Sequence, residues 1–304
     1  MPITEVSKIW MNGQLVDWQD AQVHLLTHAL HYGSGVFEGI RAYDTRKGTH
    51  VFRLTDHMRR LERSAKIYMM DMPFSVEELA AATKEVIRAN GLESCYIRPI
   101  VYRGYGEMGL FPLKAPVDVA IAVWPWGAYL GDEGIEHGIR AKISSFRRFG
   151  PNSMPPAAKA TGQYINSSLA KVEAVKAGYE EAILLDDSGN LSEGSGENLF
   201  VVRNGVVATP PSASDVLEGI TADTIARICR DEGILLKEKV MVRSELYTAD
   251  EAFLSGTAAE IVPLREVDDR LIGEPGPITR KIQDIFYSII KGENDRYEEY
   301  LEWV

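Results

Sequence analysis

The sequence predicts a two-domain protein of the α+β/α/β class, and three observations favour two domains with mixed elements over one large domain. Its 304 residues, 45% of them hydrophobic, are enough for two ordinary domains with real cores. Strand-like and helix-like segments are mixed along the whole chain, without internal repeats. Residues 126–136 are rich in turn formers and lie between two strand-like stretches. We therefore expect a small α+β domain over 1–125, an interdomain loop over 126–136 and a larger domain over 137–304.

Local signals place the elements of the first domain. Asn12-Gly13 is a strong turn signal between two short strand-like runs. Thr55 is the expected N-cap of one helix, and Asn90-Gly91 is a good end for the next. The expected elements are a hairpin over 8–16, helices over 55–68 and 75–89, and a strand over 94–103.

The second domain shows the same mixture. Gly219-Ile220-Thr221 opens a helix that closes at Gly233, and Gly256-Thr257 follows a short strand. Exposed amides at such places suit a phosphate, but Thr221 can equally be a plain N-cap, and residues 257–260 also fit a capping box. Further helices are expected over 163–177 and 278–290, and strands over 181–186 and 191–202.

Composition excludes several classes of function. The net charge of −11 argues against a general binder of nucleic acid or anionic membranes. No apolar run reaches 18 residues, and the first residues carry no apolar signal core. Cys95 and Cys229 have neither CxxC spacing nor nearby histidines, so we expect no metal site and no disulfide framework. The cytosol is the expected compartment.

One lysine is isolated in an uncharged stretch. Lys159 is the only charged residue between Arg148 and Lys171, in a chain of which a quarter is charged. Removal from bulk water favours the uncharged amine, which can attack a carbonyl and form an imine. The alternative is a solvated surface lysine, which is the commonest state of this residue type.

Arginine and aromatic residues suggest a binding pocket in the first domain. Arg59, Arg60 and Arg63 lie on the first expected helix, and one that turns inward would suit a phosphate, although the spacing does not say which. Tyr96 and Arg98 share one face of a strand. If that face is interior, Arg98 needs an anion such as a substrate carboxylate; if it is exterior, Arg98 is ordinary surface.

A glycine-rich motif offers a competing interpretation. Residues 104–109 match GxGxxG directly after a strand, as in dinucleotide-binding oxidoreductases. Such a site needs a helix N-terminus at this point to hold the pyrophosphate. Pro112 and Pro116 follow instead, and two prolines so close exclude an ordinary helix.

Taken together, the motifs resemble the branched-chain amino acid aminotransferases, fold-type IV enzymes that depend on pyridoxal 5′-phosphate. The resemblance covers nearly the whole chain in the family's order. It implies a small N-terminal α+β domain, a larger C-terminal domain with a barrel-like sheet and helices, and a homodimer or higher homo-oligomer. The matching segments are HALHYGSGVFEGIR, FRLTDHMRRLERSAKIY, YIRP, PWGAYLG, PPAAKATGQYINS, SEGSGENLF, LEGIT and SGTAAE.

The resemblance implies a reaction and a set of site residues. The reaction is reversible transfer of the amino group of L-leucine, L-isoleucine or L-valine to 2-oxoglutarate. Lys159 is the implied catalytic residue, which holds the cofactor covalently and moves the proton. The other implied cofactor-binding residues are Arg60, Tyr164, Glu193, Leu217, Gly219, Ile220, Thr221, Gly256 and Thr257. The implied substrate-binding residues are Tyr32, Phe37, Gly39, Tyr96, Arg98, Trp126, Tyr129, Thr257 and Ala258.

The sequence leaves alternatives open. Ala222 stands where the family often has Arg or Lys, which could weaken a contact near the phosphate. Another fold-type IV enzyme, such as a D-amino acid or (R)-amine transaminase or aminodeoxychorismate lyase, uses related motifs. A nucleotide-dependent oxidoreductase and a non-catalytic binding module are the alternatives from other classes.

Overall fold

The computed structural model describes residues 3–126 and 132–304, and its contacts divide the chain into two compact units. Unit 1 comprises residues 1–126, 158–163 and 289–304, and unit 2 comprises residues 127–157 and 164–288. The division differs from the sequence-based boundaries in two places. The segment around Lys159 and the C-terminal residues both pack with the N-terminal part of the chain.

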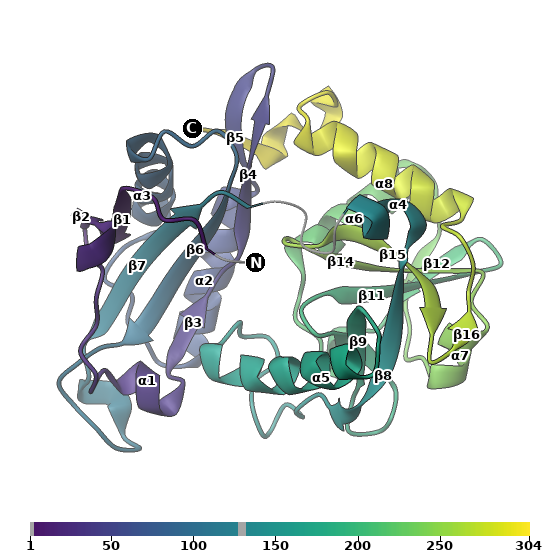
Figure 1. Ribbon diagram of the computed structural model, residues 1–304, viewed down its shortest axis with the longest axis horizontal. Coiled ribbons are helices and arrows are strands. Elements are labelled where there is room, and N and C mark those ends of the chain that lie inside the picture. The colour runs from purple at the N-terminus through teal and green to yellow at the C-terminus, as the bar shows by residue number, and fades with distance from the viewer. Residues whose placement is uncertain (1–2, 127–131) are drawn as a thin grey trace. The chain divides into compact units, whose positions relative to one another are not determined.

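Unit 1 is built on an antiparallel sheet in the order β17-β5-β4-β6-β7-β1-β2, with β3 paired to β6. Helices α2 and α3 lie against one face of it (Figure 1). The strands are β1 (Lys8–Met11), β2 (Gln14–Asp17), β3 (Gly35–Phe37), β4 (Ile40–Thr45), β5 (Gly48–Phe52), β6 (Cys95–Arg103), β7 (Val117–Trp124) and β17 (Leu301–Trp303). The helices are α1 (His28–Tyr32), α2 (Leu54–Ile67) and α3 (Val76–Ala89), with short 3-10 turns at Trp18–Asp20, Pro112–Lys114, Thr161–Gln163 and Asp295–Tyr300.

Strand alternation separates the core of unit 1 from its other face. Ile97 on β6 and Ile121 and Val123 on β7 point into the core beneath α2 and α3. Because side chains alternate along a strand, Tyr96, Arg98 and Trp124 lie on the opposite face. The hydrophobic pattern of the two strands therefore directs a group of polar and aromatic side chains away from the core.

The ends of the two long helices differ in how they are capped. Ser75 caps α3 in a reciprocal capping box with Glu78, as the sequence favours. The expected cap by Thr55 on α2 is wrong, because Thr55 lies inside the helix. Its backbone N–H and its hydroxyl donate to the carboxylate of Glu302 instead, at 2.6 and 2.9 Å. A carboxylate of the C-terminal segment thus takes the place of a local N-cap on α2. Helical spacing in the sequence cannot indicate a contact between such distant residues.

The segment that carries Lys159 is joined to β3. Ala160 forms an antiparallel bridge with Val36, and the hydroxyl of Thr161 donates to the carbonyls of Gly33 and Gly35 at 2.8 and 3.1 Å. A Cβ atom on Gly33 would lie 2.7 Å from the Cα of Gly162, so a glycine is required at this crossing. This pairing fixes the backbone of the lysine segment.

Unit 2 is built on a mixed sheet that closes on itself. The order β10-β9-β8-β15-β14-β11 is completed by direct pairing of β10 with β11, and β12 and β13 continue from β11. This confirms the expectation of a barrel-like sheet with helices. The strands are β8 (Ile139–Arg147), β9 (Glu181–Leu185), β10 (Leu191–Gly194), β11 (Asn198–Arg203), β12 (Val206–Thr209), β13 (Leu236–Glu238), β14 (Glu251–Gly256), β15 (Glu260–Val267) and β16 (Arg270–Leu271). The helices are α4 (Asp132–His137), α5 (Tyr164–Lys176), α6 (Ile220–Asp231), α7 (Arg243–Tyr247) and α8 (Pro277–Ile290), with a 3-10 turn at Ser212–Ser214.

Two local interpretations in unit 2 need correction. Residues 257–260 form no capping box, because a tight turn here joins β14 to β15 and pairs Gly256 with Glu260. Thr221 is not an N-cap either. Gly219 occupies the cap position of α6 without a side-chain cap, and Thr221 is buried in the first turn. At residues 257–260 the pairing of β14 with β15 determines the backbone, and a capping pattern takes no account of such pairing.

In the described residues 104–126, no ordinary helix follows the GxGxxG segment, as Pro112 and Pro116 predict. Residues 104–109 are followed by the 3-10 turn Pro112–Lys114 and then by β7, so no helix N-terminus faces the glycines. Across residues 3–126 and 132–304, no helix is long and apolar enough to cross a membrane. Within the same residues, no group of three or more His, Cys, Asp or Glu side chains is suited to a metal ion.

Candidate active site

Lys159 is held on both sides by backbone contacts within unit 1. Its N–H donates to the hydroxyl of Ser64 on α2 at 3.1 Å, and its carbonyl accepts the N–H of Phe37 at 3.0 Å. The side chain is partly buried, and its Nζ lies 5.3 Å from the centre of the Phe37 ring. The neighbouring Ala158 and Ala160 are each 1% exposed. The lysine therefore projects from a fixed backbone beside an aromatic ring.

Helix α2 presents one polar face in an otherwise apolar interior. His57, Arg60 and Ser64 recur at helical spacing and are all buried, whereas Arg59 and Arg63 are exposed. Of the three arginines that the sequence left open, Arg60 is thus the one that turns inward. The same helix face contacts the lysine segment through Ser64.

A buried carboxylate holds Arg60. The Nε and Nη2 atoms of Arg60 donate to Glu38 at 2.6 and 2.7 Å, and His57 Nδ1 contacts the same carboxylate at 2.8 Å. Burial alone would raise the pKa of Glu38, but the charge and hydrogen bonds of Arg60 and His57 outweigh it and hold the pKa well below its usual range. Burial lowers the pKa of His57, so this side chain is neutral at pH 7 and donates to Glu38.

Sequence reasoning missed Glu38 and His57. Apart from His31, Glu38 is the one residue with a charged side chain in the glycine-rich run 31–40. An isolated charge in an uncharged stretch is also the signal that identified Lys159, so the same criterion could have found Glu38. The planar guanidinium of Arg60 is oriented by two bonds to Glu38, so its remaining N–H groups are oriented as well.

The sheet face opposite the core collects the predicted substrate-side residues of unit 1. Arg98 Nη2 donates to the Tyr96 hydroxyl at 3.3 Å, and its guanidinium lies 4.6 Å from the centre of the Phe37 ring. Trp126 lies 5.0 Å from Tyr96, ring centre to ring centre. A Cβ on Gly39 would lie 2.0 Å from the Tyr96 hydroxyl oxygen, so only glycine allows this approach. Arg98 is half-buried among aromatic rings, as an interior position requires.

One predicted pocket residue of unit 1 is not part of this group. Tyr32 lies on α1, is 44% exposed and stacks on His28 at 4.5 Å between ring centres. Tyr129 falls outside the described residues. Within this chain, Tyr32 does not lie in the cluster of Phe37, Tyr96 and Arg98. Its role in the substrate pocket therefore stays a prediction.

Unit 2 contains a second buried carboxylate with two fixed oxygens. Arg148 Nη2 lies 2.6 Å from one oxygen of Glu193, and the N–H of Leu217 donates to the other at 2.9 Å. Arg148 is itself held by the carbonyl of Asp215 at 3.2 Å and by the ring of Phe149. Sequence reasoning missed Arg148, since nothing in its local pattern marks it.

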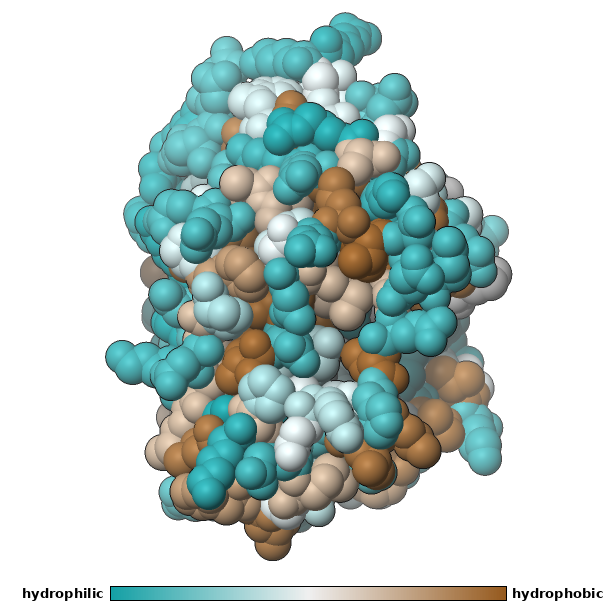
Figure 2. Space-filling model, turned by 90° about the vertical axis from the view of Figure 1, so that its left-hand side faces the viewer, coloured by the Kyte–Doolittle hydropathy of each residue, from teal (hydrophilic) through white to brown (hydrophobic). Residues whose placement is uncertain are grey.

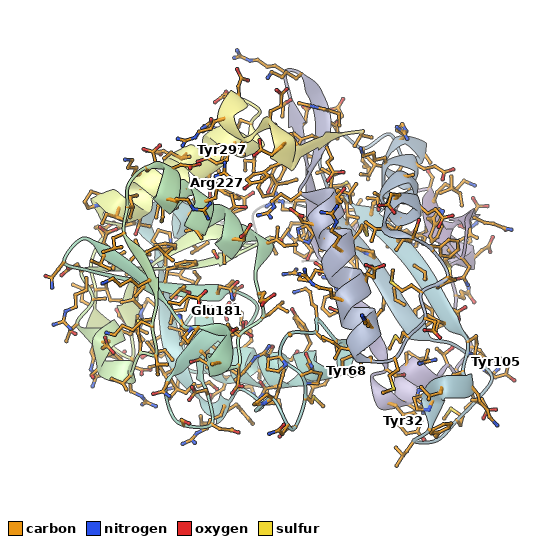
Figure 3. All side chains as sticks on the ribbon, turned by 180° about the vertical axis from the view of Figure 1, so that it is seen from behind. Tyr32, Tyr68, Tyr105, Glu181, Arg227 and Tyr297 are labelled. Carbon is orange, nitrogen blue, oxygen red and sulfur yellow. The ribbon has the colours of Figure 1, made fainter. Side chains whose placement is uncertain are left out.

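Further titratable groups lie close to Glu193. Glu181, labelled in Figure 3, is fully buried on β9 and forms an ion pair with Lys171 at 2.5 Å. Burial, assisted by the negative charge of Glu181, raises the pKa of Glu197 to about 8. The interior of unit 2 therefore favours the neutral form of the Glu197 carboxyl group.

The start of α6 and the β14–β15 turn supply the remaining predicted positions of unit 2. Ile220 and Thr221 form the first turn of α6, where backbone N–H groups carry partial positive charge. A Cβ on Gly219 would lie 1.9 Å from the Asn198 side-chain oxygen, so this backbone requires glycine. Gly256, Thr257 and Ala258 lie half-buried in the turn, and Tyr164 is the first residue of α5.

These side chains match the chemical groups of a pyridine aldehyde phosphate. Lys159 offers an amine for an aldehyde, and Glu193 offers an anchored carboxylate for a ring nitrogen. Arg60 and the N-terminus of α6 are both suited to a phosphate. The donor set of each unit thus fits such a cofactor.

Comparison with known proteins gives one consistent result. The family described as "Amino-transferase class IV" matches residues 35–267. A branched-chain-amino-acid aminotransferase of Escherichia coli K12 is 49% identical, covering 100% of this chain and 99% of that protein. The protein of the same name from Pseudomonas aeruginosa is 48% identical, covering 96% of this chain and 95% of that one.

Solved structures agree with these relatives. The crystal structure of the E. coli enzyme superposes with a TM-score of 0.96 at 49% identity, covering 98% of this chain and 99% of that one. A branched-chain aminotransferase of Thermoproteus uzoniensis with norvaline gives 0.94 at 48% identity, covering 97% and 98%. The branched-chain amino acid aminotransferase of Thermobaculum terrenum in its PLP-form gives 0.92 at 36% identity, covering 98% of each chain.

Proposed function

This chain belongs to the class IV aminotransferases and, within them, to the branched-chain amino acid aminotransferases, and on that premise we propose the reaction that it catalyses. It transfers the amino group of L-leucine, L-isoleucine or L-valine reversibly to 2-oxoglutarate and yields L-glutamate. The observation that carries the proposal is the similarity to enzymes of this name over the whole chain. The fixed position of Lys159 agrees with it.

The cofactor proposed for this chain is pyridoxal 5′-phosphate, whose ring takes up negative charge as the α-proton leaves the substrate. Lys159 Nζ would hold the cofactor covalently, and the same amine would take up and return the α-proton as base and acid. The contacts of the Lys159 backbone with Ser64 and Phe37 restrict where this amine can reach.

Glu193 is the proposed partner of the ring nitrogen. A carboxylate beside that nitrogen favours its protonated form, and Arg148 and the Leu217 N–H keep the carboxylate oriented. Tyr164 is proposed to donate to the phenolic oxygen of the cofactor, and Leu217 to pack on its ring. The proposed phosphate contacts come from Arg60, Ile220, Thr221 and Thr257, with Gly219 and Gly256 allowing close backbone approach.

The substrate side chain is proposed to lie against the sheet face of unit 1. Phe37 supplies an apolar wall for a branched side chain, and Arg98 beside it supplies a cation for the distal carboxylate of glutamate. Gly39, Tyr96 and Trp126 shape the same face. The remaining proposed contacts are Tyr32 and Tyr129 with the side chain, and Thr257 and Ala258 with the α-carboxylate.

Substitution of Arg98 by alanine tests whether one sheet face of unit 1 binds both the dicarboxylate and the branched-chain substrates. We expect kcat/KM for 2-oxoglutarate to fall about a hundredfold, because a carboxylate loses its charged partner, and that for L-leucine to change less than about threefold. Steady-state kinetics with each substrate measures both. Equal losses of kcat/KM for 2-oxoglutarate and L-leucine would contradict the proposal that Arg98 serves the dicarboxylate substrate alone.

The reaction is tested directly with a panel of amino donors. With 2-oxoglutarate as acceptor, L-valine and L-leucine should give L-glutamate, and D-alanine and (R)-1-phenylethylamine should not. Borohydride reduction and peptide mapping should place a pyridoxyl group on Lys159. A pyridoxyl group on another lysine, or bound NAD without cofactor absorbance, would contradict the proposal.

We also propose that the chain is at least a homodimer. Large apolar side chains are exposed in segments 25–30 and 105–111 of unit 1, and Leu110, Leu25 and Phe111 are 92%, 74% and 69% exposed. Tyr32 and Tyr105, labelled in Figure 3, lie at the same end of unit 1, and Figure 2 shows hydrophobic surface gathered toward that end. Surfaces of this kind mark protein interfaces.

Sedimentation should give at least twice the 33.8 kDa chain mass, and Leu110→Asp with Phe111→Asp should shift it toward the monomer. A monomeric wild type at micromolar concentration would refute the dimer. The cytosol is the proposed compartment, because both cysteines are free and buried, which suits reducing conditions.

A further inference from the structure

Three side chains on strands β6 and β7 share one face of the unit 1 sheet. Tyr96 lies directly opposite Trp124 in the antiparallel register, and Arg98 lies opposite Ala122. Trp124 is therefore the diagonal neighbour of Arg98, a spacing that long side chains bridge. The ring centres of Tyr96 and Trp124 are 5.2 Å apart. Trp124 thus belongs to the group that contains the proposed substrate cation, although no motif marked it.

Two hydrogen-bond donors in this group lack acceptors. The Nε atom of Arg98 and the Nε1 atom of Trp124 are buried without a hydrogen-bond partner in the described part of the chain. The Trp124 residue is only 8% exposed. Buried donors are nearly always paired in folded proteins, and leaving one unpaired is costly. Two such donors on one sheet face indicate that their acceptor comes from outside the described residues, and a bound ligand can supply it.

The chemistry of the donors limits the acceptor. An indole N–H and a guanidinium N–H can only donate, so the missing group must accept from both. A carboxylate has two oxygens and a negative charge that matches Arg98. An aliphatic side chain offers no acceptor, so both N–H groups would stay unpaired beside it.

We propose that Trp124 is a specificity-determining residue whose indole N–H donates, together with Arg98, to the distal carboxylate of glutamate and 2-oxoglutarate. The proposal rests on the proposed function, because it assumes that this face receives the substrate side chain. It adds a contact that favours dicarboxylates over branched-chain substrates. Trp124 thereby sets the balance between the two halves of the reaction.

Replacing Trp124 by phenylalanine removes the N–H and keeps an aromatic ring in the sheet. We expect kcat/KM for 2-oxoglutarate to fall about tenfold or more, mainly through KM, since a hydrogen bond to a charged group is lost. The value for 4-methyl-2-oxopentanoate should stay within about twofold or improve, because no unpaired donor is left beside an aliphatic chain. Equal changes for both oxo acids, or no change for 2-oxoglutarate, would overturn the proposal.

Trp10→Phe is the matched control. Trp10 is 5% exposed and packs edge-on against Phe74 in the core of the same unit, so this variant also loses a buried indole. The ratio of the two kcat/KM values should stay at the wild-type level. If Trp10→Phe shifted that ratio as Trp124→Phe does, the effect would be a general one of packing and the proposal would fail.

A binding measurement gives a readout that does not depend on turnover. Titration of glutarate and of 4-methylpentanoate into the holoenzyme gives two dissociation constants. The first measures binding of a dicarboxylate, and the second measures binding of an aliphatic side chain. Trp124→Phe should weaken glutarate about tenfold relative to 4-methylpentanoate. A wild type without amino transfer from any donor would refute the proposed function. An active wild type whose preference for glutarate persists in Trp124→Phe would refute this inference alone.

Discussion

The Lys159→Ala enzyme is expected to lose at least about a thousandfold in the rate of amino transfer from L-leucine to 2-oxoglutarate. The reason is that one amine serves both as the covalent attachment point and as the carrier of the α-proton. Lys159→Arg should be equally inactive, because a guanidinium keeps the positive charge but does not act as a base at neutral pH. Coupled assay of glutamate formation measures both variants.

Lys176 provides the control for this experiment. It is the last residue of α5 and is exposed, so Lys176→Ala should keep wild-type activity within about twofold. Substantial residual turnover in Lys159→Ala, above about a tenth of the wild type, would show that another group carries out the proton transfer.

Glu38→Gln is expected to destabilise the apoprotein by about 3–5 kcal/mol, because it leaves the buried Arg60 charge without its partner. Glu38→Gln combined with Arg60→Gln should be less destabilising than Glu38→Gln alone, since no uncompensated charge is then buried. Urea unfolding followed by circular dichroism measures the three free energies. An additive loss in the double variant would mean that the two residues do not act as a pair.

Glu62 on the same helix supplies the control. Its side chain is exposed, so Glu62→Gln should change the unfolding free energy by less than about 0.5 kcal/mol. A loss as large as that of Glu38→Gln would show that any acid on α2 matters, and that the buried contact with Arg60 is not the cause.

The same cluster makes stability depend on pH. The lowered pKa of Glu38 means that its stabilising effect is present above the unfolded value of about 4.3 and is lost as the pH falls below it. The lowered pKa of His57 acts in the same direction from about pH 6.5 downward, because the unfolded histidine takes up a proton first. In the Glu38→Gln, Arg60→Gln double variant, only the part of this pH dependence that is due to Glu38 should disappear. Urea unfolding at a series of pH values measures it.

The sequence by itself determined the element types and the chemistry that they carry. The Asn12-Gly13 hairpin, helix α3 and the strand with Tyr96 and Arg98 follow from turn signals, capping and alternation, which act over a few residues. The isolated charge of Lys159 indicated an unusual environment for the same local reason. The family resemblance then linked segments that no local pattern could link.

Only the tertiary structure decided which groups face one another. It selected Arg60 among three arginines, because Glu38, which also contacts His57, pairs with Arg60 in the interior. It replaced the expected Thr55 cap by a contact with Glu302, 247 residues away along the chain. It also placed Trp124 opposite Tyr96 with an unpaired N–H. Each of these depends on strand register or on the pairing of distant charges, and such long-range pairings leave no periodic signal in the sequence.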